Sequence, residues 1–260
     1  MKQMKRITQE VTHVLALIAA CAFLLPASLR GDDGETAEIY ENYGTYTLDA
    51  PPPEMRPIVL VIPRQFLYGS SRTAPLRTWG VNLLTYYPSF TTASEPENAN
   101  FGLNCIGICN GQILISIQNR AHSISAVSPN MGDYIARAQL KFLNTLPLPP
   151  NARVRKLEPV ESFSDAIERT LVNPVDQKVA QIDRLYMRSA RDGEGYDLVA
   201  TCSVNPLRTT CTLHFSLTCN PAIYVSVVGL DGSYLSRSPD IREKVDRFVS
   251  AMVRNPPCNT

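Results

Sequence analysis

The chain has 260 residues and a formal net charge of +1, with 44% hydrophobic and 19% charged residues. Because basic and acidic residues are nearly equal in number, the chain has no excess of positive charge with which to attract nucleic acid or anionic lipid. We therefore expect no nucleic acid among its partners. A chain of this length and apolar content can bury a full core, as one large domain or two small ones.

The first thirty residues have the order of an export signal, in which basic residues precede an apolar run. The run covers residues 14–27, and the basic residues before it are Lys2, Lys5 and Arg6. A membrane span usually needs about twenty apolar residues, so this shorter run favours a cleaved signal. Because residues 11–29 could still span a thinned bilayer, residues 1–30 are predicted to be a signal peptide or a membrane anchor, with residues 14–27 as the tether.

Cys21 offers a third outcome, because residues 18–21 resemble a bacterial lipobox whose cysteine becomes lipidated. The plainer interpretation is that Cys21 is one small hydrophobic residue of the run. In each case the protein leaves the cytosol, and we expect it in the periplasm or elsewhere in the cell envelope. An oxidising compartment makes the other six cysteines candidates for disulfide bonds.

Residues 31–57 change in composition, with seven acidic residues opposed only by Arg56 and with three consecutive prolines at 51–53. This predicts a solvated linker that stiffens into polyproline II before a globular domain over residues 58–260. The proline-rich stretch 146–150 could divide that domain into two subdomains.

Three strands and two helices are predicted in the first part of the domain. The strands are the β-branched run 58–62, the weaker alternation over 80–87, and residues 112–118, where every second residue is Ile. One helix is predicted over residues 132–144. A second helix is predicted to begin at Ser164, because Asp165 would place a negative charge in its first turn. Ile167, Leu171 and Val172 would then form one apolar stripe.

The carboxyl-terminal third has the clearest pattern. Apolar and polar residues alternate over 196–202 and 211–219, and a third apolar run follows at 223–228, which predicts an antiparallel β-meander. Ser238 is predicted to cap a helix over residues 239–254 that covers the apolar face of the meander with one stripe: Ile241, Val245, Phe248, Val249 and Met252. The predicted fold is therefore α+β, with an antiparallel sheet under a carboxyl-terminal amphipathic helix.

This layout predicts a set of disulfide bonds that staple the domain. Cys202 and Cys211 fall on one face of neighbouring strands, where opposite side chains approach closely enough for a bridge. The last strand and the final helix have similar lengths, so the chain returns and brings Cys258 close to Cys219. The remaining pair, Cys105 and Cys109, would close a very small ring.

The same spacing of Cys105 and Cys109 occurs in some copper and redox sites, and thiols in such turns can be reactive. His122 and His214 are the histidines of the exported part that could join them, but no second cysteine pair with metal-binding spacing is present. We therefore expect a structural bridge, with neither metal nor cofactor, and interpret His214 as a surface residue of its strand.

Two classes of function remain. The first is a non-enzymatic envelope protein that binds a protein or a small ligand, of which an immunity protein against a secreted toxin would be one instance. The second is an envelope enzyme, or a thiol–disulfide or metal-binding protein, that uses Cys105 and Cys109. The sequence lacks a nucleophile elbow, a zinc-protease motif, a phosphate loop and a calcium loop, which favours the binding module.

Overall fold

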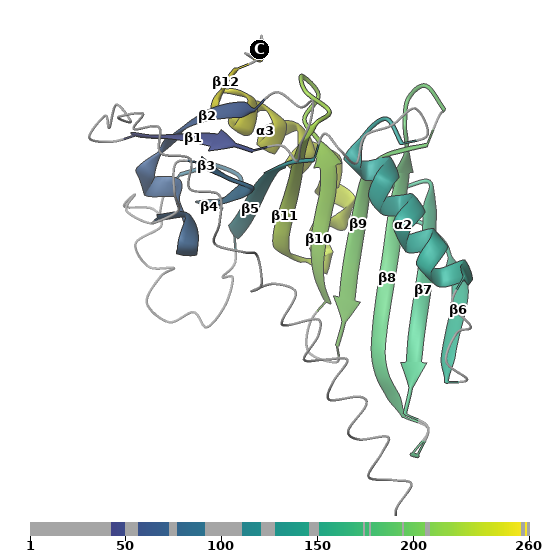
Figure 1. The fold of residues 1–260 in the computed structure, drawn as a ribbon. Helices are drawn as coiled ribbons and strands as arrows, with labels where there is room; N and C mark the ends of the chain where they lie inside the picture. Colours follow the sequence, from purple (N-terminus) through teal and green to yellow (C-terminus); the bar gives the residue numbers. More distant parts are fainter. Residues whose placement is uncertain are drawn as a thin grey trace, which may run out of the picture. The chain divides into compact units, whose positions relative to one another are not determined.

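An antiparallel sheet of eight strands organises the domain in a computed structural model of the chain (Figure 1). In spatial order its strands are β4 (Gly80–Tyr86), β5 (Gln112–Asn119), β11 (Ile223–Asp231), β10 (Thr209–Ser216), β9 (Tyr196–Val204), β8 (Val179–Ser189), β7 (Asp165–Val172) and β6 (Ala152–Leu157).

The structure describes residues 43–49, 57–72, 77–91, 111–120, 128–145, 151–173, 175–176, 178–193, 195–205, 209–255 and 258. All of them belong to one unit of the chain, Ala37–Thr260. Cys21, Cys105, Cys109 and His122, together with the stretch 146–150, lie outside the described residues, so the predictions made for them stay predictions. The large sheet contains strands from both sides of that stretch.

A second, smaller sheet has the order β12 (Val253–Asn255), β2 (Ile58–Pro63), β1 (Tyr43–Leu48) and β3 (Arg77–Thr78). The longer helices are α2 (Met131–Thr145) and α3 (Ser238–Ser250), and short 3-10 turns are η1 (Arg64–Phe66), η2 (Gly69–Arg72) and η5 (Gly232–Arg237). No described helix combines the length and the apolar character that crossing a membrane requires.

The two helices lie on opposite faces of the large sheet, α2 in front and α3 behind in Figure 1. The predicted stripe of α3 joins the main core together with Leu213 and Phe215 of β10. A smaller cluster under α2 contains Ala136, and Val199 of β9. The α+β prediction, with an antiparallel meander under the last helix, is confirmed.

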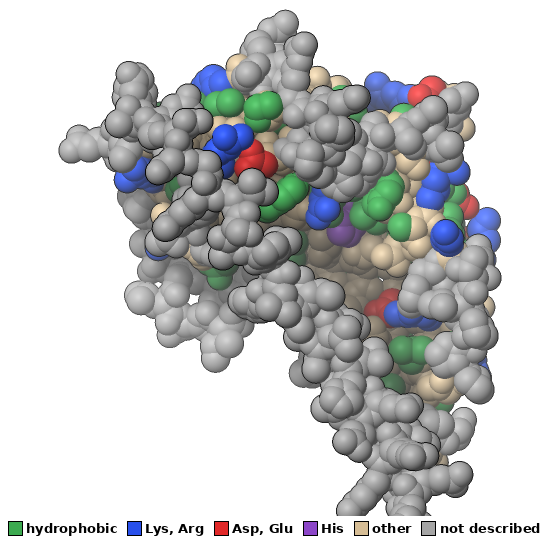
Figure 2. Space-filling view, viewed as in Figure 1, with side chains coloured by type: hydrophobic (Ala, Val, Ile, Leu, Met, Phe, Trp, Pro, Cys, Tyr) green, Lys and Arg blue, Asp and Glu red, His purple; other side chains and the backbone are tan. Residues whose placement is uncertain are grey.

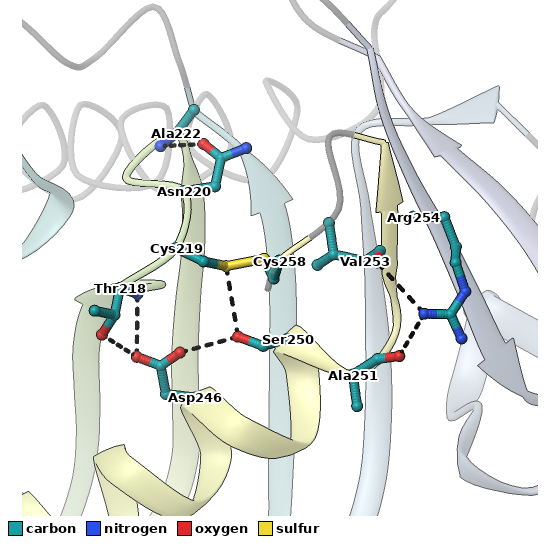
Figure 3. The surroundings of a disulfide bond; sticks show 10 residues. All are labelled: Thr218, Cys219, Asn220, Ala222, Asp246, Ser250, Ala251, Val253, Arg254 and Cys258. Atoms are coloured by element: carbon teal, nitrogen blue, oxygen red, sulfur yellow. Dashed lines mark hydrogen bonds between the residues drawn. A yellow bond between two sulfur atoms is a disulfide. The ribbon is translucent and has the colours of Figure 1, made fainter. Parts of the chain in front are cut away.

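Both disulfides predicted for the carboxyl-terminal third are present. Cys202 of β9 faces Cys211 of β10 in register and is bonded to it. Cys219 is bonded to Cys258, 39 residues further along the chain. Figure 3 shows how α3 supports the second bridge: Ser250 Oγ lies 3.5 Å from Cys219 Sγ and donates a 3.1 Å hydrogen bond to Asp246 Oδ1.

Three details of the prediction are wrong. Ser164 begins no helix, because the residues after it form β7, and its hydroxyl donates to the Met187 carbonyl at 3.0 Å. Ser238 is the first residue of α3 and not its cap, since η5 runs directly into the helix. The helix ends at Ser250, because β12 then pairs with β2.

Part of the range predicted to be a linker is strand. β1 lies within residues 31–57 and pairs with β2 over its whole length, from Tyr43 opposite Pro63 to Leu48 opposite Ile58. Its alternate residues Tyr46 and Leu48 are buried in the main core.

Candidate functional site

A hollow of about 510 Å³ opens on the α2 face of the large sheet. Its wall is the side of α2 that carries Ile135 and Gln139, and its floor comes from strands β7 to β10. Figure 2 shows this face, where histidine, basic and hydrophobic side chains gather around the hollowed region. The hollow therefore combines apolar side chains, such as Ile135, Ile167 and Leu185, with polar and charged ones.

Part of the floor is a row of residues in register across four strands. Arg169 of β7 lies opposite Asp183 of β8, which lies opposite Ser203 of β9 and then Thr210 of β10. Arg169 Nη2 donates to Asp183 Oδ2 at 2.5 Å. Gln181 Nε2 donates to both oxygens of the same carboxylate, at 2.8 and 2.9 Å. These contacts fix the orientation of the Asp183 side chain.

His214 of β10 forms another part of the floor. Its Nε2 lies 2.9 Å from Thr201 Oγ1, its Nδ1 lies 2.7 Å from Tyr224 Oη, and its ring stacks on the Tyr224 ring. Burial lowers the pKa of His214 to about 4, so the imidazole is neutral at pH 7. With both nitrogens engaged, His214 serves to hold the floor together.

The wall of the hollow is fixed by a buried carboxylate at the start of α2. Asp133 is fully buried and accepts hydrogen bonds from Arg137 Nε at 2.6 Å and from the Tyr196 backbone N–H at 3.3 Å. Gly195 has a φ of +79°, and a Cβ atom there would lie 2.2 Å from Asp133 Oδ1. A glycine is therefore required for the turn before β9 to approach α2 this closely.

A second charged group lies on the opposite face of strands β6 to β8. Glu168 is buried and accepts hydrogen bonds from Arg155 Nε at 2.8 Å and Arg184 Nε at 2.9 Å. Burial alone would raise the pKa of this carboxyl, but the hydrogen bonds and charges of Arg184 and Arg155 outweigh it and lower the pKa. The group ties three neighbouring strands together.

β6 and the first residues of β8 carry many exposed side chains. Residues 153–156 and 179–181 are exposed, and Val179 is 57% exposed. Arg169 of β7 and Gln181 and Asp183 of β8 also line the hollow, so this more exposed part of the sheet continues directly from its floor.

The residues predicted from the sequence do not converge on this site. Cys202 borders the hollow, but its bond to Cys211 belongs to the core on the other face. His214 is on the polar face of its strand as predicted, yet it is largely enclosed and hydrogen-bonded. Among the described residues no cluster of histidine, cysteine, aspartate or glutamate could hold a metal ion.

Arg169, Asp183 and Glu168 were not identified from the sequence, because nothing in their local pattern marks them. Each has a charged partner on a neighbouring strand. Arg169 and Asp183 are 14 residues apart in the chain, and Glu168 and Arg184 are 16 residues apart. Only the strand register brings these charges together.

No family model matches the chain, and no curated protein matches its sequence. One solved structure that superposes on the chain is that of Smlt3025, an immunity protein of the Stenotrophomonas maltophilia type IV secretion system. The two share 15% sequence identity with a TM-score of 0.49, over 80% of this chain and 94% of the other. At this identity and TM-score the similarity says nothing about the function of this chain.

Proposed function

We propose that this chain is an exported binding module of the cell envelope, that its partner is a protein, and that it caps that partner as an immunity protein caps a toxin. The observation that carries the proposal is the open hollow of about 510 Å³, whose floor is already ordered by its own hydrogen bonds. A surface ordered in advance loses little conformational entropy on binding.

The composition of the hollow supports a protein partner. Ile135, Ile167 and Leu185 supply apolar area, and Arg169 supplies a guanidinium next to them. Apolar area with arginine and few uncompensated charges is typical of the centre of a protein–protein interface. Export is supported by the order of residues 1–30 and by the two disulfides, which form and persist in oxidising compartments.

The proposal is tested by capture of the partner from the cell envelope of the source organism, with the full-length chain under non-reducing conditions. The wild-type chain is expected to retain one partner in stoichiometric amount. Thr212→Arg is expected to abolish capture, because Thr212 lines the hollow and the longer side chain would fill it. Repeated recovery of the bare wild-type chain would contradict the proposal.

A matched control is Ser236→Arg, which adds the same side chain at an exposed position of η5. This variant is expected to capture the partner as the wild type does. Thermal unfolding of both variants must resemble that of the wild type, so that lost capture is not caused by lost folding.

A further inference from the structure

Strand β6 has an exposed outer edge. It is the last strand of the large sheet among the described residues, pairs on its inner side with β7, and exposes residues 153–156. The outer side of an edge strand presents backbone N–H and C=O groups that no ladder satisfies. Such an edge is a template on which an extended segment of another protein can add a strand.

The side chains of β6 restrict which strand can be added. Arg153, Arg155 and Lys156 are all basic, and β6 contains no acidic residue. A second copy of β6 would bring like charges together across the new pair, which disfavours self-pairing. An acidic strand would instead meet a complementary edge: Arg155 and Lys156 already contact Glu168 and Asp165, but their side chains stay 68% and 75% exposed.

The two faces of β6 differ, and the register shows how. Arg153 and Arg155 lie opposite Thr170 and Glu168, on the face that carries the Glu168 group. Val154 and Lys156 lie opposite Arg169 and Ile167, on the face that carries the hollow, and Val154 is 39% exposed. A matching strand would therefore place acidic side chains on the first face and, on the second, an apolar side chain over Val154 next to Lys156, so that acidic and apolar residues alternate.

We infer that the outer edge of β6 pairs with an extended segment of the partner protein in which acidic and apolar residues alternate. This inference rests on the proposed function and specifies the chemistry of the partner. The added strand would continue the sheet surface that forms the floor of the hollow, so the edge and the hollow would engage one partner side by side.

The probe is a capped hexapeptide of alternating Glu and Val, added to the full-length chain labelled for amide NMR. We expect shifts and slowed hydrogen exchange at β6 amides, and weaker binding at higher salt. A Lys-Val hexapeptide, with reversed charge, is expected to leave β6 unchanged. A Glu-Pro hexapeptide keeps the acidic charge but lacks alternate N–H donors, and is expected to bind β6 much more weakly.

Arg153→Gln is expected to weaken binding of the Glu-Val peptide by about threefold, the effect typical of an exposed ion pair. Arg191→Gln is the matched control, because Arg191 is exposed in the turn between β8 and β9 and is expected to have no effect. The inference is overturned if β6 does not respond to the Glu-Val peptide, or if the Glu-Pro peptide binds equally well, which would show charge attraction without strand pairing.

These outcomes separate the inference from the proposed function. A partner that is captured by the wild type and lost on Thr212→Arg, with β6 unresponsive to the peptide, would leave the function standing and overturn the inference. Failure to capture any partner would contradict the function whatever the peptide does.

Discussion

His214 is a neutral histidine enclosed in a sheet face, and this makes stability depend on pH. Its pKa is lowered from 6.5 to about 4 by burial, so between these values the unfolded chain binds a proton that the folded chain does not. The stabilisation is complete above pH 6.5 and is lost as the pH falls. Between pH 7 and pH 5 we expect the free energy of unfolding to drop by about 2 kcal/mol.

The measurement is denaturant unfolding at the two pH values, with His214→Gln as the comparison because glutamine can hydrogen-bond without titrating. The variant is expected to lose most of the pH dependence in this range. Glu168, and Asp197 of β9, which accepts a hydrogen bond from Arg188 Nε, have lowered carboxyl pKa values and contribute only at more acidic pH. An equal pH dependence in wild type and variant would show that His214 is not responsible.

At the scale of an element, the Cys219–Cys258 bridge holds the segment that contains the carboxyl-terminal strand β12. Its loop spans 39 residues, against 9 for Cys202–Cys211, and a longer loop removes more entropy from the unfolded chain. Loop entropy alone gives about 4 kcal/mol for the longer bridge and about 3 kcal/mol for the shorter. We expect the double substitution Cys219→Ala with Cys258→Ala to lower the unfolding free energy more than Cys202→Ala with Cys211→Ala.

Hydrogen exchange distinguishes this effect from general weakening. The longer bridge fixes the segment that carries β12, so its loss is expected to speed amide exchange in β12 and in β2, with which β12 pairs. The shorter bridge joins β9 and β10, which share five further residue pairs in register, and its loss is expected to leave β12 protected. The reverse pattern would contradict this assignment of roles.

The elements that the sequence predicts well are those with one buried face. β10 alternates between core residues and polar residues, and α3 carries a stripe at helical spacing, so a local pattern was sufficient. β7 fails for the opposite reason: its buried face contains Ala166 and Glu168, a small residue and a charge. The remaining Ile167, Leu171 and Val172 fit a helical stripe, which produced the wrong prediction.

The candidate site was less predictable than the fold, and the reason is again non-local. β6 and the first half of β8 are exposed on both faces, so neither shows an apolar alternation, and neither strand was predicted. Arg169, Asp183 and Glu168 acquire their roles from partners on adjacent strands. A single sequence does not contain that register.

At the scale of the whole molecule, the two faces of the large sheet are packed differently. On the α3 face, apolar side chains of both sheets and of the helix form the main core. On the α2 face, the helix covers a small cluster and leaves the hollow beside it. The proposed binding surface is therefore separated from the main core by the sheet.

The oxidation state of the cysteines tests the whole molecule, because it reports the compartment in which the chain folds. We expect protein isolated from its own cell envelope, denatured without reductant, to protect Cys202, Cys211, Cys219 and Cys258 from alkylation. Reduction before alkylation should expose all four, since both bridges are present in the folded chain. Mass spectrometry of the digested protein reads each cysteine separately, and the fate of Cys21 is read in the amino-terminal peptide.

The same experiment decides between the two classes of function that the sequence allows. Cys105 and Cys109 are predicted to be bridged as well, and their protection would agree with a structural role. If these two alone react while the other four are protected, the thiol–disulfide or metal-binding alternative becomes the better account, because a free thiol pair in an oxidising compartment must be kept reduced or occupied. Reaction of the other four without reductant would contradict export to an oxidising compartment, on which both classes depend.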